Sequence, residues 1–468
     1  MALVAFRIGS LALAVAAISF AQYKTINPRV QEVVASVSEE RIAGTMKKLE
    51  TFGTRNISST ITDPAHGVGA ARQWILDEFK SYSPRLEVRF DKHRIKAGGR
   101  VPKDVELWNV IAVLPGKTQP EVQVVVSGHY DTIASSRTAA ERAAASTAGG
   151  ASAASSEDEG FKAGDPDAAA PGVSDDGSGT AVTMELARTL SKYEFDKTLV
   201  FIAFAGEEVG LYGSRLYATD AKKAALKIEA VLNNDIVGND SAGNGVVNNT
   251  RVLVFSEDPG DSPSRQVARY MKDMTERYFP GMIAEPVFRE DRFSRGGDHS
   301  PLLREGFAAV RITTPSENFA NQHSKTDTFA NASASYTTRV ARVNAATAAS
   351  LAWAPRVPVI VRTVETGPRK GLTMPLLRRG ASGYDAELSW KNDQPEADLL
   401  GYVVVVRSTL APFWEREVYV GNVAKFTFKD LSIDTHVFGV KAIDKEGNES
   451  LVAAYGLAPR RYTTIETY

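Results

Sequence analysis

Cysteine is absent from the 468 residues, so no disulfide contributes to the stability of this protein. An excess of charge of either sign is also absent, because 55 Lys and Arg residues nearly balance 56 Asp and Glu residues. This balance provides no broad attraction toward nucleic acid or an anionic membrane and argues against polyanion binding. The hydrophobic content of 43% is enough for a large core, and the length suggests more than one domain.

Beyond the N-terminus, no segment is apolar enough to span a membrane. The first residues carry one positive charge, Arg7, and lead into an apolar run from Leu11 to Phe20, with small residues flanking a cleavage position before Gln22. This pattern predicts a signal peptide over residues 1–21. A membrane anchor is the alternative, but the run is shorter than the roughly 20 residues that a bilayer requires. We therefore expect a secreted or periplasmic protein without stable membrane insertion after cleavage, and the absence of cysteine is compatible with export.

Strand and helix patterns alternate over the first two thirds of the chain. Nearly continuous apolar runs predict buried strands at 122–126, 198–203, 230–232, 252–255 and 308–312. Helical spacing predicts helices at 31–48, 70–82, 180–190, 262–278, 301–305 and 339–353. The alternation predicts an α/β domain whose mainly parallel sheet is flanked by helices.

Five polar segments are placed along this scaffold. They are Gly128-His129-Tyr130-Asp131, Asp175-Asp176-Gly177-Ser178-Gly179, Glu207-Glu208, Asn234-Asp235 and His323 with Asp327. Three of them follow predicted strands, and open α/β sheets bind ligands at the carboxyl ends of their strands. Imidazole nitrogen and carboxylate oxygen are zinc ligands, so two imidazoles and three carboxylates, one of them shared, suit a pair of zinc ions. A hydrolase is the leading hypothesis.

These motifs, in this order, resemble the co-catalytic dizinc aminopeptidases, a family that also contains glutamate carboxypeptidases. The resemblance extends over about residues 35–352 and includes Phe52-Gly53-Thr54-Arg55, Asn109-Val110-Ile111-Ala112 and Gly297-Asp298-His299-Ser300-Pro301. It implies the zinc exopeptidase fold, two Zn²⁺ ions and peptide substrates.

The resemblance also implies a role for each motif residue. One zinc would be held by His129 and Asp235 and the other by Glu208 and His323, with Asp175 bridging them. Asp175 is chosen over Asp176 because the first residue of that run bridges the metals in the family. Glu207 would be the general base that takes a proton from the metal-bridging water.

Two further carboxylates are expected to orient the two imidazoles. We expect Asp131 to accept the second N–H of His129 and Asp327 to do the same for His323. The alternative for Asp131 is that it caps a turn.

Candidates for the substrate pocket lie near His299, in a segment that resembles one close to the family's pocket. We interpret His299 as pocket wall or structural support rather than a zinc ligand. Arg292 and Arg295 are candidates for binding a substrate carboxylate, because arginine binds such groups bidentately, and loop solubility is the alternative.

The substrate class stays open between an aminopeptidase and a carboxypeptidase. An exported aminopeptidase is favoured because this is the commoner activity among exported relatives with this motif set. A single-zinc glutaminyl cyclase and a noncatalytic peptide-binding protein are further alternatives, and the complete set of ligands argues against both.

Two regions depart from the peptidase pattern, which is expected over 22–355. Residues 133–170 are rich in Ala, Ser and Gly and predict a low-complexity insertion, either flexible or forming a lid. Residues 356–468 carry short alternating strands and resemble a fibronectin type III sandwich, a small all-β domain with Trp390 and Tyr402 in its core. Its strands are expected at 387–390, 401–407, 425–428 and 437–443. A spacer or stabilising role is expected for this module.

Overall fold

The computed structural model describes residues 25–134, 165–257, 260–293, 295–364, 366, 370–391 and 396–456. The predicted signal peptide and most of the predicted insertion lie outside these residues. The chain forms two compact units, a larger one within Pro28–Trp353 and a smaller one formed mainly by the residues from Ala354 onward. Among the described residues, no helix combines the length and the apolarity needed to cross a membrane.

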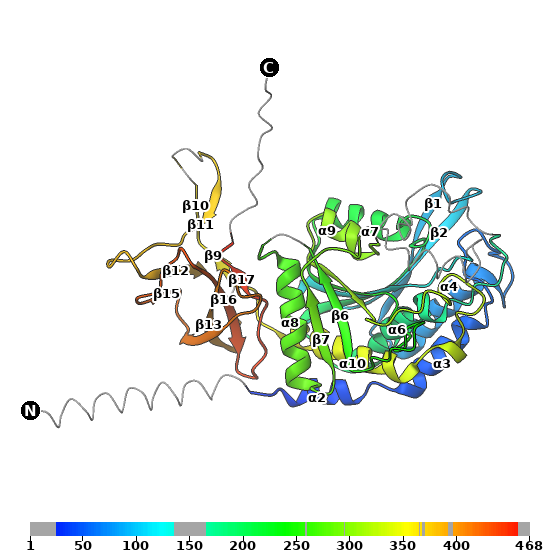
Figure 1. The fold of residues 1–468 in the computed structure, drawn as a ribbon, viewed down its shortest axis with the longest axis horizontal. Coiled ribbons are helices and arrows are strands. Elements are labelled where there is room, and N and C mark those ends of the chain that lie inside the picture. The colour runs from blue at the N-terminus through cyan, green and yellow to red at the C-terminus, as the bar shows by residue number, and fades with distance from the viewer. Residues whose placement is uncertain are drawn as a thin grey trace, which may run out of the picture. The chain divides into compact units, whose positions relative to one another are not determined.

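An eight-stranded mixed sheet forms the centre of the larger unit, with the strand order β1-β2-β4-β3-β5-β8-β6-β7 (Figure 1). The strands are β1 (Glu87–Ile95), β2 (Val105–Leu114), β3 (Gln119–His129), β4 (Lys197–Phe204), β5 (Lys227–Asn234), β6 (Arg251–Ser256), β7 (Ile283–Val287) and β8 (Ala309–Thr313). Strands β4, β3, β5 and β8 run parallel, whereas β2 is antiparallel to β4 and β6 is antiparallel to β8. The expectation of a mainly parallel sheet is therefore correct only for the central strands.

Burial explains why β4 was predicted and β1 was not. Every residue of β4 is buried, as expected for a strand covered on both faces, and its sequence is correspondingly apolar. Strand β1 at the sheet edge contains no fully buried residue and carries charged side chains. This strand, its partner β2, and the edge strand β7 were not predicted.

Helices cover both faces of this sheet, with α7 and α9 on one face and α6 and α10 on the other (Figure 1). The helices are α2 (Pro28–Ala35), α3 (Glu39–Glu50), α4 (Gly67–Tyr82), α6 (Ser178–Leu190), α7 (Tyr212–Lys223), α8 (Pro263–Tyr278), α9 (His299–Arg304) and α10 (Ala334–Trp353), with the short turns η2 (Val173–Gly177) and η3 (Phe329–Asn331). The prediction of one helix over 31–48 is wrong. The chain breaks there because Ser38 caps α3, its Oγ accepting the N–H of Arg41 at 3.2 Å.

The smaller unit contains only β-strands among its described residues after Trp353. They are β9 (Val359–Ile360), β10 (Arg362–Val364), β11 (Thr373–Pro375), β12 (Ala386–Lys391), β13 (Leu399–Ser408), β14 (Arg416–Gly421), β15 (Lys425–Phe428), β16 (His436–Asp444) and β17 (Ala453–Ala454). They form sheets in the orders β15-β12-β9 and β14-β13-β16-β17, plus the ribbon β10-β11. Trp390 and Tyr402 are buried in one core, with ring centroids 5.5 Å apart.

Candidate metal centre

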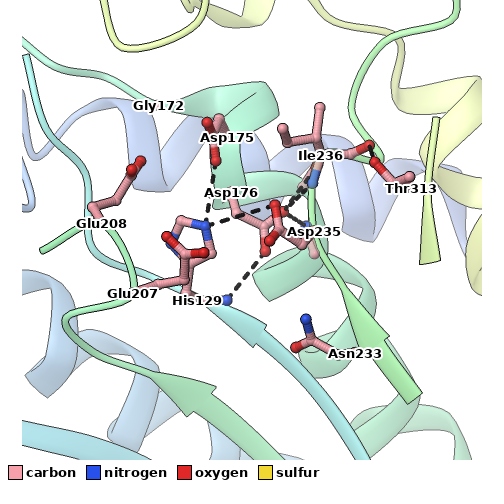
Figure 2. A network of polar contacts seen from close by, with 12 residues as sticks. His129, Gly172, Asp175, Asp176, Glu207, Glu208, Asn233, Asp235, Ile236 and Thr313 are labelled. Atoms are coloured by element: carbon pink, nitrogen blue, oxygen red, sulfur yellow. Dashed lines mark hydrogen bonds and ion pairs between the residues drawn. The ribbon is translucent and has the colours of Figure 1, made fainter. Parts of the chain in front are cut away.

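Neighbouring parallel strands bring the polar motifs to one edge of the sheet. His129 is the last residue of β3, the Glu207-Glu208 pair follows β4, and Asp235 follows β5. Asp175 comes from η2, directly before α6, and His323 comes from the loop after β8. Figure 2 shows His129, Asp175 and Asp235 converging from these separate elements.

Asp175 lies between the two imidazoles. Its Oδ1 is 3.3 Å from Nε2 of His129, and its Oδ2 is 3.1 Å from Nε2 of His323. The same nitrogen of His323 is 3.0 Å from Oε2 of Glu208, while Nε2 of His129 is 3.9 Å from Oδ1 of Asp235. One carboxylate therefore faces two half-sites, each with its own histidine and its own further carboxylate.

The donor atoms fit a cation. Nε2 of His129, Oε1 of Glu208 and Oδ2 of Asp235 are buried and make no hydrogen bond. Buried polar atoms are normally hydrogen-bonded, so three such exceptions in one place indicate a missing ligand. Two groups, His129 with Asp175 and Glu208, and His129 with Glu207 and Asp235, each place their ligand atoms within 4.8 Å of one another. Imidazole and carboxylate are the donors that zinc takes.

The charges of the centre are poorly balanced without a cation. Burial raises the pKa of Glu207 well above its ordinary value, and the nearby charges of Asp235 and Glu208 raise it further. Burial lowers the pKa of His323, but the negative charge of Glu208 and a hydrogen bond to Asp175 outweigh it and raise this pKa well above its ordinary value. A metal would displace these protons, because its ligands must be neutral imidazole and ionised carboxylate.

Asp176 connects three segments of the chain by accepting hydrogen bonds from their backbone N–H groups. Its Oδ2 accepts the N–H of His129 at 3.1 Å, and its Oδ1 accepts the N–H groups of Gly179 at 2.8 Å and Ile236 at 3.2 Å. Ile236 follows the predicted ligand Asp235 directly. Asp176 thus ties together the ends of β3 and β5 and the start of α6, while Asp175 faces the two imidazoles.

Comparison with known proteins identifies the family of this centre. Residues 109–348 match peptidase family M28. The chain is 34% identical over 457 residues to a probable zinc metalloprotease of Pyricularia oryzae, covering 90% of this chain and 83% of that protein. It is 32% identical over 452 residues to a probable zinc metalloprotease of Leptosphaeria maculans, covering 90% and 95%. The chain belongs to peptidase family M28. The crystal structure of the Legionella pneumophila LapA aminopeptidase shares the fold, with a TM-score of 0.50 and 17% identity over 71% of this chain and 77% of that one.

In this M28 peptidase, both the backbone carbonyl and the carboxylate of Asp131 lie near Nδ1 of His129. Nδ1 of His129 lies 3.1 Å from the backbone carbonyl of Asp131 and 3.6 Å from its carboxylate. Because a carbonyl only accepts, Nδ1 carries the proton, which leaves Nε2 free for a metal. The Asp131 carboxylate also accepts the N–H groups of Glu207 at 3.1 Å and Glu208 at 3.3 Å. The side chain therefore positions the loop that carries both glutamates.

Asp327 accepts hydrogen bonds from the backbone of the turn that carries Asp175. Its two oxygens accept the N–H groups of Ser174 at 2.9 Å and Asp175 at 3.0 Å. The expectation that it orients the ring of His323 stays a prediction. Asp327 fixes the turn that presents Asp175, since an ionised carboxylate makes strong hydrogen bonds to backbone N–H groups.

Two of the three predicted pocket residues are brought together around a carboxylate that was not predicted. Arg292 and Arg295 both pair with Glu317, the latter at 2.8 Å. Burial raises the pKa of Glu317, but the two guanidinium groups outweigh it and hold that pKa at about 2. His299 is buried, and its Nε2 donates to the carbonyl of Glu290 at 2.8 Å. Burial lowers the pKa of His299 to about 3, so the ring is neutral and supports the loop structurally.

Arg311 is a further residue of the centre that sequence reasoning missed. It lies in the buried strand β8 and pairs with Oδ1 of Asp235 at 2.9 Å. A charged residue inside an otherwise apolar strand is the signal that identifies it. Gly297 makes this approach possible, because a Cβ there would lie 2.5 Å from the Arg311 guanidinium and 2.8 Å from the Asp235 carboxylate.

Proposed function

We propose that this M28 peptidase is an exported, zinc-dependent aminopeptidase that removes N-terminal residues from peptides. The observation that carries the proposal is the position of Asp175, with one oxygen toward each imidazole. His129 and Asp235 would hold one zinc ion and Glu208 and His323 the other, and Asp175 would be shared between them. The description of two relatives as probable zinc metalloproteases supports the choice of zinc.

The proposed chemistry divides between the metals and Glu207. Zinc held by these residues would supply a bound water of lowered pKa and a Lewis acid for the scissile carbonyl. Glu207, next to the ligand Glu208, takes the water's proton and returns it to the leaving amine.

The arginine cluster favours an aminopeptidase over a carboxypeptidase. A carboxypeptidase needs a cationic clamp for the terminal carboxylate. The two candidate arginines are already paired with Glu317, which offsets one of their two charges. Carboxypeptidase activity stays the second candidate, because the cluster keeps one net positive charge.

Two further parts of the proposal concern the ends of the chain. Export is inferred from the sequence of residues 1–21, outside the described residues. The C-terminal unit is proposed to be a fibronectin type III-like module. Its two antiparallel sheets and its shared core around Trp390 support this assignment.

Metal content and substrate range test the function together. Purified protein is assayed for zinc and for hydrolysis of aminoacyl p-nitroanilides and of N-blocked peptides, with and without a chelator. Two zinc ions and chelator-sensitive cleavage only of substrates with a free amine are expected. Cleavage only of blocked peptides with a free carboxylate would make the enzyme a carboxypeptidase, and one zinc with cyclisation of N-terminal glutamine would make it a glutaminyl cyclase. Protein without metal and without turnover would overturn the proposal.

A further inference from the structure

Arg55 is a fully buried cation beneath the metal centre. It follows α3 in the segment Phe52-Gly53-Thr54-Arg55, and its exposed fraction is 0%. A buried arginine is costly unless its N–H groups are satisfied and its charge is compensated. Such a residue calls for an explanation in terms of what it holds in place.

The guanidinium of Arg55 connects three segments of the chain. Nε donates to the carbonyl of Tyr130 at 2.5 Å, directly after the predicted ligand His129. Its terminal nitrogens donate to the carbonyls of Pro171 at 2.5 Å and Gly172 at 2.8 Å, in the loop that leads to Asp175. A further bond at 3.1 Å reaches Leu49 at the end of α3. The backbone N–H of Arg55 adds a bond to Thr132 at 2.9 Å.

All four acceptors of the guanidinium are backbone carbonyls, so no hydrogen-bonded carboxylate neutralises its charge. The compensating charges lie further away, on Asp327, Asp131, Asp176 and Asp175. Burial lowers the pKa of Arg55 to about 10, which still leaves the group charged at neutral pH.

The loop at Gly172 packs closely against Arg55. Gly172 has a φ of +49°, and a Cβ on it would meet Thr132 at 2.2 Å, the carbonyl of Asp175 at 2.6 Å and the guanidinium of Arg55 at 3.2 Å. The loop therefore folds directly onto the arginine. A shift of the guanidinium would therefore displace this loop relative to the end of β3.

We infer that Arg55 is a positioning residue that fixes the bridging Asp175 relative to His129 and thereby sets the zinc affinity of the centre. This inference rests on the proposed function, since it concerns the same pair of ions. The planar guanidinium group is needed because its N–H groups point toward acceptors in different directions, whereas a lysine offers three donors from a single atom.

The test measures zinc affinity by competition with a chromogenic chelator in the full chain carrying R55M, R55K or R72M. Arg72 is the matched control, because it is also buried, donates to the carbonyl of Glu106 at 2.9 Å and stacks on Trp108. We expect R55M to weaken zinc binding by about 10- to 100-fold, as the loss of groups that orient metal ligands generally does. R55K is expected to show a smaller loss, and R72M is expected to bind as the wild type does. Circular dichroism establishes that each variant is folded.

The outcomes separate this inference from the proposed function. If the wild type binds no zinc, the proposed function and the inference fail together. If the wild type binds zinc and hydrolyses peptides while folded R55M binds zinc equally well, only the inference is overturned. If R55M does not fold, the zinc affinity of R55K provides the test. An R55K variant that binds zinc as tightly as the wild type would overturn the role assigned to the guanidinium group. A loss in R72M equal to that in R55M also overturns it, because a general effect of removing a buried arginine would then be sufficient.

Discussion

At the scale of single residues, the adjacent glutamates Glu207 and Glu208 carry different proposed roles. Glu208 is the more buried, at 6% exposure, and faces His323 at 3.0 Å. Glu207 groups with His129 and Asp235 on the side of the other proposed ion. The two adjacent glutamates thus lie on different sides of the proposed centre. Matched substitutions of the two can distinguish a general base from a metal ligand.

The first prediction concerns this pair. Glu207→Gln is expected to lower kcat by about 10²- to 10⁴-fold while both zinc ions stay bound, because it removes only the proton acceptor. Glu208→Gln is the matched control and is expected to lose one zinc equivalent. Steady-state kinetics and zinc analysis of both variants provide the test. Turnover retained in Glu207→Gln would exclude this residue as the base.

The second prediction concerns Glu317, which pairs with two arginines. Glu317→Gln is expected to cost about 3 kcal/mol near pH 7, because it leaves unpaired the charges of two arginines whose side chains are only 13% and 16% exposed. Its folded pKa of about 2 lies below the ordinary 4.5, so the stabilisation is complete above pH 4.5 and is lost as the pH falls toward 2. The difference in unfolding free energy between wild type and variant should therefore shrink below pH 4.5.

Urea unfolding at pH 7, 5 and 3.5 measures this dependence. Glu285→Gln is the control, since Glu285 forms an ion pair with Arg251 at 2.8 Å that is nearly half exposed on both sides. Exposed pairs contribute at most about 1 kcal/mol, so this variant should stay close to the wild type. A Glu317 variant as stable as the control at pH 7 would contradict the prediction.

At the scale of elements, the loop after β4 depends on a side chain that comes from the end of β3. Asp131 accepts the N–H groups of both Glu207 and Glu208, so one carboxylate fixes the direction in which the loop leaves the strand. An ionised carboxylate can satisfy both donors, whereas an asparagine has a single acceptor oxygen.

The third prediction follows from this geometry. Asp131→Asn is expected to weaken zinc binding by about tenfold, because one glutamate N–H then faces an amide donor and the loop shifts. Asp196→Asn is the control, since Asp196 precedes the opposite end of β4 and accepts from Thr118 at 2.5 Å. Zinc titration of both variants provides the measurement. Equal affinities would show that Asp131 does not hold the loop in the metal-binding arrangement.

The elements also show what could be predicted from the sequence. Apolar runs located the buried strands β3, β4 and β5, and the motifs that follow them indicated the residues that converge. The charged edge strand β1 has no such run and was missed. The backbone contacts of Asp176, the partner of Arg311 and the reach of Arg55 depend on segments far apart in the chain. Local spacing in the sequence carries no information about these long-range contacts.

At the scale of the whole molecule, the chain divides into two compact units with separate cores. The proposed metal ligands all belong to the larger unit, whereas Trp390 and its neighbours form the core of the smaller one. A ligand stabilises only the part of a protein that it binds, in proportion to how far its concentration exceeds the dissociation constant. Zinc is therefore expected to stabilise one unit selectively.

The fourth prediction is that calorimetry resolves two unfolding transitions and that a chelator lowers only one of them. Zinc at 1,000 times its dissociation constant contributes about 4 kcal/mol to the folded state, so its removal should lower the transition temperature of the larger unit by several degrees. The transition of the smaller unit serves as an internal control in the same sample, because it contains none of the proposed ligands. Adding zinc back should restore the first transition. A chelator that leaves both transitions unchanged would contradict metal binding, and one that lowers both equally would contradict the independence of the two cores.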